Sequence, residues 1–283
     1  MSITRLKDVV ENCYNNGQYT MSGFRKVPAI ASTAGTWSDL TMAPGNPKPN
    51  YYVGAELTAT VLEARSGLFH GENVSPLKKY LHKVTLGGIG SANQAGTYIL
   101  CDFLLFYPLV DMDSTDEQTM INTTPLPRYT DGKGVRAFLV ATNPYIGGAQ
   151  FITKYVNQSG DTVYSCPNVS NSATLIGTIV NSTTTGVNNV GPFIQGAGGA
   201  QGIRRVESVQ FLAPNGGLAS LVLCVPLATI IVNEISAFSE EDFLSFNPSL
   251  PRIYDGAVLG FIFCPTGSVA AAQYTGVITT IFN

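Results

Sequence analysis

Charged residues are scarce in this chain of 283 residues. Asp, Glu, Lys and Arg together make up 12% of the sequence, about half of the roughly 25% that soluble domains carry. The net charge of −3 and the pI near 5.4 leave too little basic surface to neutralise many phosphates, which excludes a general nucleic-acid binder. Because 45% of the residues are hydrophobic, the chain can still bury a core, and this excludes disorder.

Histidine and tryptophan are also scarce, and the cysteines show no spacing typical of a metal site or a disulfide framework. The chain has two histidines, His70 and His82, one tryptophan, and five cysteines without a Cys-x-x-Cys spacing. These counts argue against a zinc site and a disulfide framework. Cys101, Cys224 and Cys264 lie inside apolar runs, where we expect free cysteines to pack as small hydrophobic residues.

Motifs for catalysis or cofactor binding are missing as well. No Gly-x-Ser-x-Gly elbow is present, and the glycine-rich run 196–202 lacks the Gly-Lys-Ser/Thr of a phosphate loop. The stretch Asp111–Glu117 resembles the start of a calcium loop, but its sixth position is Asp116 rather than glycine. We therefore interpret it as an acidic turn. We expect no enzyme, no catalytic residue, no cofactor and no metal site.

Long hydrophobic runs are absent too. The most apolar stretch, 218–232, is about 15 residues long and is interrupted by Ser220, Pro226 and Thr229, short of the roughly 20 residues that a membrane helix needs. The charged residues near the N-terminus interrupt any signal-peptide core. We expect no membrane partner and no secretion by that route.

Glycine, proline and uncharged polar residues are abundant, and they favour short strands joined by tight turns. The chain contains 29 Gly and 16 Pro, residues that set turn geometry. The apolar segments between them predict strands at 80–86, 98–109, 134–141, 150–156, 173–180, 206–212, 218–227, 230–235, 258–264 and 275–282. Many short strands at this spacing are typical of a sandwich or a jelly roll.

The first 65 residues carry a different pattern. Helical spacing of apolar residues predicts one short amphipathic helix at the N-terminus, ending at Asn15-Asn16-Gly17. Four prolines and little periodicity between 21 and 50 predict an extended arm. A second helix is predicted around 55–65, where Leu57, Val61 and Ala64 share one face.

An internal repeat is the most informative feature of the sequence. The segment Leu126-Pro127-Arg128-Tyr129-Thr130-Asp131-Gly132 recurs as Leu250-Pro251-Arg252-Ile253-Tyr254-Asp255-Gly256, and an apolar strand follows each copy. Another apolar run ending in Pro-Leu and an acidic stretch precede each copy. Proline can fix the entry to the corner, Asp-Gly can supply a turn, and arginine can satisfy nearby carbonyls. We interpret the copies as structural corners rather than as binding sites.

The repeat predicts a chain built from two related halves. The fold class predicted is mainly β, a jelly-roll-like β-sandwich with a short N-terminal helix and an extended arm. We divide the chain into the helix and arm at 1–50, a first β half at 51–149 and a second β half at 150–283. Whether the halves form two sandwiches or one intertwined unit stays open.

Several stretches resemble virion proteins encoded by tailed bacteriophages. The resemblance covers about residues 50–283 and is carried by GLFHGENVSPLKKYL, LCDFLLFYPLVDMDSTDEQ, LPRYTDGKGVRAFLVATNP, GGLASLVLCVPLAT and LPRIYDG. It implies a virion location, with the host cytoplasm as the place of assembly, but it transfers no residue role.

The low charge of the surface suits contacts between subunits. We therefore expect a capsid cement or decoration protein on the phage head, a homo-oligomer, with a trimer favoured, that binds the major capsid protein. The alternative is a tail or fibre component that binds a host surface glycan. A third hypothesis is a tail enzyme that cleaves polysaccharide, although the 19 acidic residues supply no sequence test for it.

Overall fold

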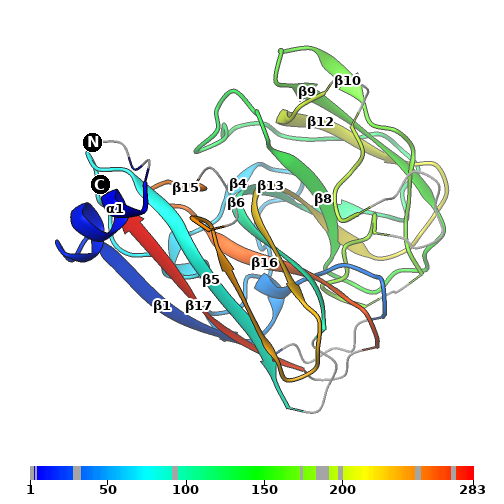
Figure 1. Ribbon diagram of the computed structural model, residues 1–283. Coiled ribbons are helices and arrows are strands. Elements are labelled where there is room, and N and C mark those ends of the chain that lie inside the picture. Colours follow the sequence, from blue (N-terminus) through cyan, green and yellow to red (C-terminus); the bar gives the residue numbers. More distant parts are fainter. Residues whose placement is uncertain are drawn as a thin grey trace.

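The computed structural model describes residues 3, 5–27, 33–90, 95–172, 175–182, 191–196, 200–245, 250–268 and 272–283. It is mainly β, with 47% strand and 6% helix, and its strands form three antiparallel sheets (Figure 1). The expected mainly-β, sandwich-like fold with one short N-terminal helix is therefore confirmed. Among the described residues no helix is long and apolar enough to cross a membrane.

The central sheet contains the two longest strands. Its order is β2-β16-β6-β13-β8, and β4 pairs with β6 beyond the end of β16. The bounds are β2 Ser38–Asp39, β4 Thr60–Val61, β6 Gly96–Asp111, β8 Arg136–Ala141, β13 Leu218–Val232 and β16 Leu259–Pro265. β6 and β13 lie side by side in the middle, and their hydrophobic residues have little or no exposure along most of their length.

Two outer sheets complete the architecture. One has the order β14-β5-β17-β1-β3, with β15 also paired to β5, and the other has the order β10-β9-β12-β7, with β11 also paired to β9. The first is built from β1 Tyr19–Lys26, β3 Gly45–Asn46, β5 Lys79–Ile89, β14 Phe238–Asp242, β15 Arg252–Ile253 and β17 Gln273–Phe282. The second is built from β7 Gln118–Thr119, β9 Gln150–Asn157, β10 Thr162–Tyr164, β11 Asn168–Val169 and β12 Ile203–Phe211. In Figure 1 the first lies at the left and the second at the upper right.

Both outer sheets pack against the same face of the central sheet. Alternation along β8 and β16 sends every second side chain to that face. Leu139 of β8 packs in the core beneath β9 and β12, and Phe261 of β16 packs in the core beneath β5 and β17. The opposite face carries a third core, which Met42, Tyr52 and Leu62 cover.

The two sequence repeats are intertwined. β6 of the first repeat pairs with β16 of the second, and β13 of the second pairs with β8 of the first. Likewise β5 pairs with β17 and with β14, and β12 pairs with β9 and with β7. Each outer sheet therefore combines strands from both repeats. The two halves form one intertwined unit and not two separate sandwiches. β9, which begins at Gln150, belongs to the first repeat by this pairing.

The register of β6 against β13 places an approximate two-fold axis at the centre of the molecule. Leu105 lies opposite Leu223, and the same spacing relates Pro108 of LLFYPLV to Pro226 of LVLCVPLA. Pro226 lies at a register shift in the ladder, where the missing proline N–H costs the least. The apolar stretch 218–232 is accordingly one long strand rather than the two strands that were predicted.

The N-terminal segment differs in part from its prediction. A short helix is present as α1 Leu6–Asp8, continued by the π-helical turn η1 Val9–Tyr14, and it buries Val9 and Cys13 against Ile281. Residues 21–50 were predicted to form an extended arm, but the first part of this segment is a paired strand. β1 pairs with β17 along its whole length, because alternate residues of β1 point inward and bury Phe24 and Lys26.

Two further predictions are corrected by the structure. The helix expected at 55–65 is absent: Leu57 has φ 49°, the chain pairs with β6 at β4, and a single 3-10 turn follows as η3 Ala64–Ser66. Backbone pairing with β6 overrides the helical spacing here. The strand expected at 173–180 is a turn with isolated bridges at Thr178 and Ile179, while its residues 173 and 174 lie outside the described part.

Candidate functional site

The two corner motifs meet at the centre of the molecule. The first lies between β7 and β8, and the second lies between β14 and β16 and contains β15. The rings of Tyr129 and Tyr254, one from each motif, contact edge to face with centroids 5.0 Å apart. Leu126 is buried in the core under the second outer sheet, and Leu250 packs against the core under the first. The motifs therefore join the two cores.

Arg128 ties the first motif to the central sheet and to the second motif. Its guanidinium donates to both carboxylate oxygens of Asp102, at 2.9 Å and 2.6 Å. It also donates to the carbonyl oxygen of Gly256 at 2.9 Å and to that of Phe103 at 3.1 Å. Asp102 accepts a further bond from the backbone N–H of Val258 at 3.0 Å. All the charge of this buried pair is matched by hydrogen bonds.

Asp102 is the residue of this site that the sequence analysis missed. It is 1% exposed, and burial raises the pKa of its carboxyl group, against the opposing effect of Arg128 and the Val258 N–H. The signal was present, because Asp102 is the only charged residue in the apolar run YILCDFLLF. A lone carboxylate inside a central strand needs a buried cation, and the repeat arginine supplies it.

Arg252 occupies the equivalent position in the second motif but has different partners. It donates to the carbonyl oxygen of Lys79 at 3.0 Å, and its guanidinium lies 5.4 Å from the ring centroids of both Tyr80 and Tyr254. No described carboxylate forms an ion pair with it within 4 Å. Arg252 thus fastens β15 to β5 by one hydrogen bond and two cation–π contacts.

The aspartates of the motifs also differ in their contacts. Asp131 accepts from the backbone N–H of Lys133 at 3.1 Å, which closes the predicted turn locally. Asp255 instead accepts from the N–H of Val74 at 3.2 Å and lies 3.6 Å from the Lys79 ammonium. The side chain of Asp255 therefore binds a distant loop, whereas the side chain of Asp131 contacts its own turn.

The prolines and glycines behave as corner residues. Gly132 and Gly256 have φ of 77° and 75°, the left-handed region that the Asp-Gly turn predicts. The carbonyl of Pro251 accepts from the N–H of Leu81 at 2.9 Å, and Pro127 is exposed at the surface. The eight proline, arginine, aspartate and glycine residues of the two motifs thus lie in one region, and the contacts described above are structural.

A buried cation lies next to the second motif. Lys79 has no exposed surface, and its ammonium donates to the carbonyls of Glu72 at 2.7 Å and Gly71 at 3.2 Å. It also lies 3.3 Å from Nδ1 of His70, whose Nε2 is 3.0 Å from the carbonyl oxygen of Ala257. The ammonium of Lys79 can only donate a hydrogen bond, and the carbonyl oxygen of Ala257 can only accept one. His70 is therefore neutral, with its proton on Nε2. Burial, and then Lys79, lowers the pKa of His70.

A second buried polar cluster contains Lys26 of β1, Asp39 and Tyr52, and Tyr52 belongs to the third core. Lys26 donates to the carbonyls of Pro47 at 2.8 Å and Ala43 at 3.0 Å, and burial lowers its pKa to about 8. Asp39 accepts from the hydroxyl of Tyr52 and from the N–H of Thr41. The adjacent cavity has only about 10 Å³ of free volume, room for no more than one water. The cluster serves packing and not substrate binding.

The acidic stretch 111–117 is held by its own turn and by contacts with Gly216 and Ser208. Asp111 accepts from the N–H of Asp113 at 2.9 Å, and Asp113 accepts from the N–H of Gly216 at 3.1 Å. Glu117 accepts from the hydroxyl of Ser208. Across the part of the chain that the structure describes, no group of three or more His, Cys, Asp or Glu side chains is placed to hold a metal ion.

Comparisons with known proteins do not assign a family. No known protein family and no curated protein matches the chain. Among solved structures, the VP2 subviral particle of infectious bursal disease virus aligns with 94% of this chain and 80% of its own, at 9% identity and a TM-score of 0.19. The structure of the Gt strain of that virus aligns with 94% and 81%, at 9% identity and a TM-score of 0.15. Likenesses this low carry no argument about fold or function.

Proposed function

We propose that this chain is a structural virion protein, a cement or decoration protein that binds and stabilises the head shell of a tailed bacteriophage. The main support for this proposal is a surface with few charges and with exposed apolar side chains. Only 12% of residues are charged, while large apolar side chains are exposed on all three sheets or their loops, among them Met21 at 64%, Ile146 at 73% and Ile231 at 58%. A surface of this kind favours burial against other subunits.

The rigidity of the centre supports the same proposal. The motifs that sequence analysis singled out form a buried ion pair, an aromatic contact and two turns, and these contacts fix the two cores relative to each other. A clamp between shell subunits needs such a rigid body. The resemblance of the same motifs to virion proteins of tailed phages agrees with this role, which needs no catalytic residue, cofactor or metal.

The partners proposed are the major capsid protein and further copies of this chain, as a homotrimer. The test is attachment of the purified full chain to isolated phage heads that lack it, followed by sedimentation of the heads and by imaging of the decorated particles. We expect saturable attachment at regular positions on the shell and a mass in solution of three chains. If the heads sediment and the protein stays in the supernatant, the proposal is overturned.

The same material separates the alternative function. A tail or fibre component would leave the heads bare, decorate tails, and bind immobilised host glycan in a saturable way. A polysaccharide-cleaving enzyme would release oligosaccharide from host capsule during incubation with the purified chain. Either result would replace the proposed head-binding role.

A further inference from the structure

One edge of the central sheet is open where the strand beside it ends. β8 pairs with β13 only from Ala219 to Cys224. Beyond that point, on the side away from β6, no described strand pairs with β13. Thr229 is exposed, and Ile231 is 58% exposed. Unpaired backbone groups along such an edge are a template for an added strand.

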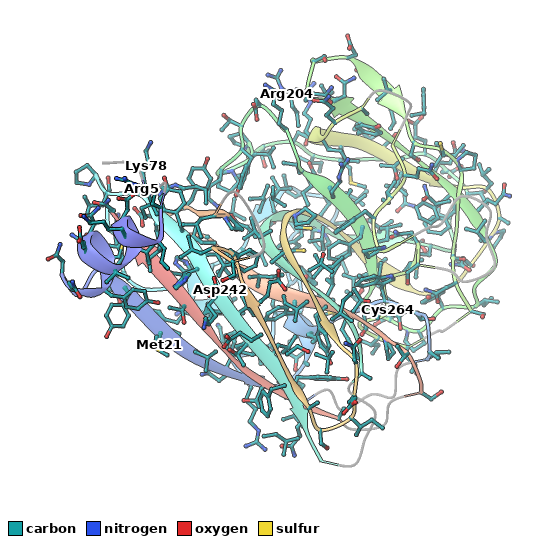
Figure 2. The ribbon with its side chains drawn as sticks, viewed as in Figure 1. Arg5, Met21, Lys78, Arg204, Asp242 and Cys264 are labelled. Atoms are coloured by element: carbon teal, nitrogen blue, oxygen red, sulfur yellow. The ribbon has the colours of Figure 1, made fainter. Side chains whose placement is uncertain are left out.

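A depression lies beside this open edge. It has a volume of about 300 Å³ and is lined by Pro226, Leu227, Ala228 and Thr229 of β13 together with Glu241 and Phe243. Glu241 forms no ion pair within 4 Å with any described residue, whereas its neighbours Glu240 and Asp242 both lie within 4 Å of Lys83. Figure 2 labels Asp242, which ends β14 next to this depression and lies far from Arg204 of the other outer sheet.

The internal two-fold relation shows what fits at this position. Pro108 is the counterpart of Pro226 in the first repeat. There the edge of β6 is occupied: the backbone N–H of Leu57 donates to the carbonyl of Pro108 at 2.9 Å, and β4 pairs at Thr60 and Val61. The occupying segment, Leu57-Thr58-Ala59-Thr60-Val61, is uncharged and rich in β-branched residues. It precedes both repeats, so the chain supplies no second copy of it for Pro226.

We infer that the depression beside Pro226 takes an extended peptide segment of a partner protein, which adds as a short strand to the open edge of β13. The segment is uncharged and β-branched like its counterpart at Pro108, and it carries one cationic side chain that faces Glu241. Backbone bonds to β13 give affinity and the side chains give specificity, as in other cases of strand addition. This inference rests on the proposed function and names the surface that grips the partner.

A peptide probe tests the depression directly. The probe is a fluorescein-labelled peptide with the sequence of residues 57–61 followed by one lysine, and its anisotropy is measured against the purified full chain. We expect saturable binding that Thr229→Lys weakens by about tenfold or more, because a lysine on an edge strand opposes strand addition and neutralises Glu241. Glu241→Gln weakens it less, and the matched control Ile146→Lys, at an exposed loop site, leaves it unchanged. Melting temperatures confirm that each variant is folded.

The outcomes separate this inference from the proposed function. Absence of saturable peptide binding to the wild-type chain, or equal binding to the wild-type chain and to Thr229→Lys, overturns the strand-addition site even if the chain still attaches to heads. Peptide binding that depends on Thr229 supports the site even if head attachment fails, in which case the proposed function alone is wrong. Dissociation of a homo-oligomer by Thr229→Lys would show that a second copy fills the depression, and it would overturn the choice of a different partner.

Discussion

Arg128 and Arg252 occupy equivalent positions in the repeat, but their surroundings differ. Arg128 neutralises a carboxylate that is 1% exposed, whereas among the described residues Arg252 contacts a carbonyl and aromatic rings. Removal of one member of a buried ion pair leaves an uncompensated charge, which costs far more than the loss of one hydrogen bond.

The two arginines therefore form a matched pair for mutagenesis. We expect Arg128→Met to lower the free energy of unfolding by about 3–5 kcal/mol, because Asp102 stays buried without its cation. Arg252→Met should cost about 1–2 kcal/mol. Urea unfolding followed by circular dichroism measures both values. Equal losses in the two variants would contradict the different roles assigned to them.

The two corner glycines make a second prediction at the residue scale. A Cβ on Gly132 would lie 2.8 Å from the backbone N of Arg204 and from the carbonyl carbon of Ile203, whereas a Cβ on Gly256 meets nothing within 4 Å. Gly256→Val should therefore cost only the backbone strain of a positive φ, about 1–3 kcal/mol. Gly132→Val should cost more, because β12 must also move. Unchanged melting temperatures in both variants would refute the turn assignment.

The charge state of His70 predicts a pH dependence. The groups that face its ring are the Lys79 ammonium, the Asp255 carboxylate near that ammonium, and the Ala257 carbonyl. The pKa of His70 is lowered in the folded state. Below about pH 6.5 the unfolded chain therefore binds a proton at this histidine that the folded chain does not bind. Stability should fall as the pH drops from 7 through 6.5 toward the lowered pKa.

His70→Gln tests this dependence, with urea unfolding at pH 7.5 and pH 5.5 as the measurement. The variant should lose less stability than the wild type between the two values. His82 contributes in the same direction, because its pKa is lowered chiefly by burial, so part of the dependence should remain in His70→Gln. An identical loss in wild type and variant would show that His70 does not titrate in this range.

At the scale of elements, the N-terminal segment changes character between sequence and structure. Pro28, Pro44, Pro47 and Pro49 predict an extended arm. In the structure β1 pairs along its length with β17, Phe24 lies in the core of the first outer sheet, and residues 40–62 cover the third core. A simple anchoring arm would leave these cores intact when removed.

Deletion of residues 1–50 should therefore abolish the folded state. The deletion exposes one edge of β17 and uncovers part of the apolar face of the central sheet, and both promote aggregation. Expression of the truncated chain with analysis of the soluble fraction by size-exclusion chromatography and circular dichroism measures this. A soluble, folded truncated chain would restore the arm hypothesis.

At the scale of the whole molecule, the exchange of strands between repeats decides the cooperativity. Each outer sheet and the central sheet contain strands of both repeats. Neither half can close its own core, because β5 lacks β17 and β12 lacks β9 when the repeats are separated. The contacts are also long-range in sequence, a topology that folds slowly.

Two measurements test this cooperativity. Urea unfolding should show one transition, with coincident curves from the fluorescence of Trp37 and from circular dichroism. Fragments 51–157 and 158–283, which separate β9 from β12 and β5 from β17, should each be unfolded or insoluble when expressed separately. Two resolved transitions, or a folded fragment, would indicate that each half is an independent unit.

The sequence by itself determined the class of the fold and most of its strands. Glycine, proline and alternating apolar residues act locally, so β5, β6, β8, β9, β12, β16 and β17 were found near their observed bounds. The repeat also located the corner residues, because a turn with positive φ has a local signature in Asp-Gly. The small share of charged residues is the sequence observation behind the proposal that other subunits cover the surface.

Only the tertiary structure decided which strands pair and which carboxylate meets which cation. Asp102 and Arg128 are joined by folding and not by adjacency, as are Lys79 and Asp255, so no local pattern pairs them. The same holds for β1 and for the segment around Leu57, whose strand or extended state comes from backbone bonds to distant partners. The open edge at Pro226 is likewise a product of the fold. The segment around Leu57 covers the equivalent edge at Pro108, whereas no described strand pairs with β13 at Pro226.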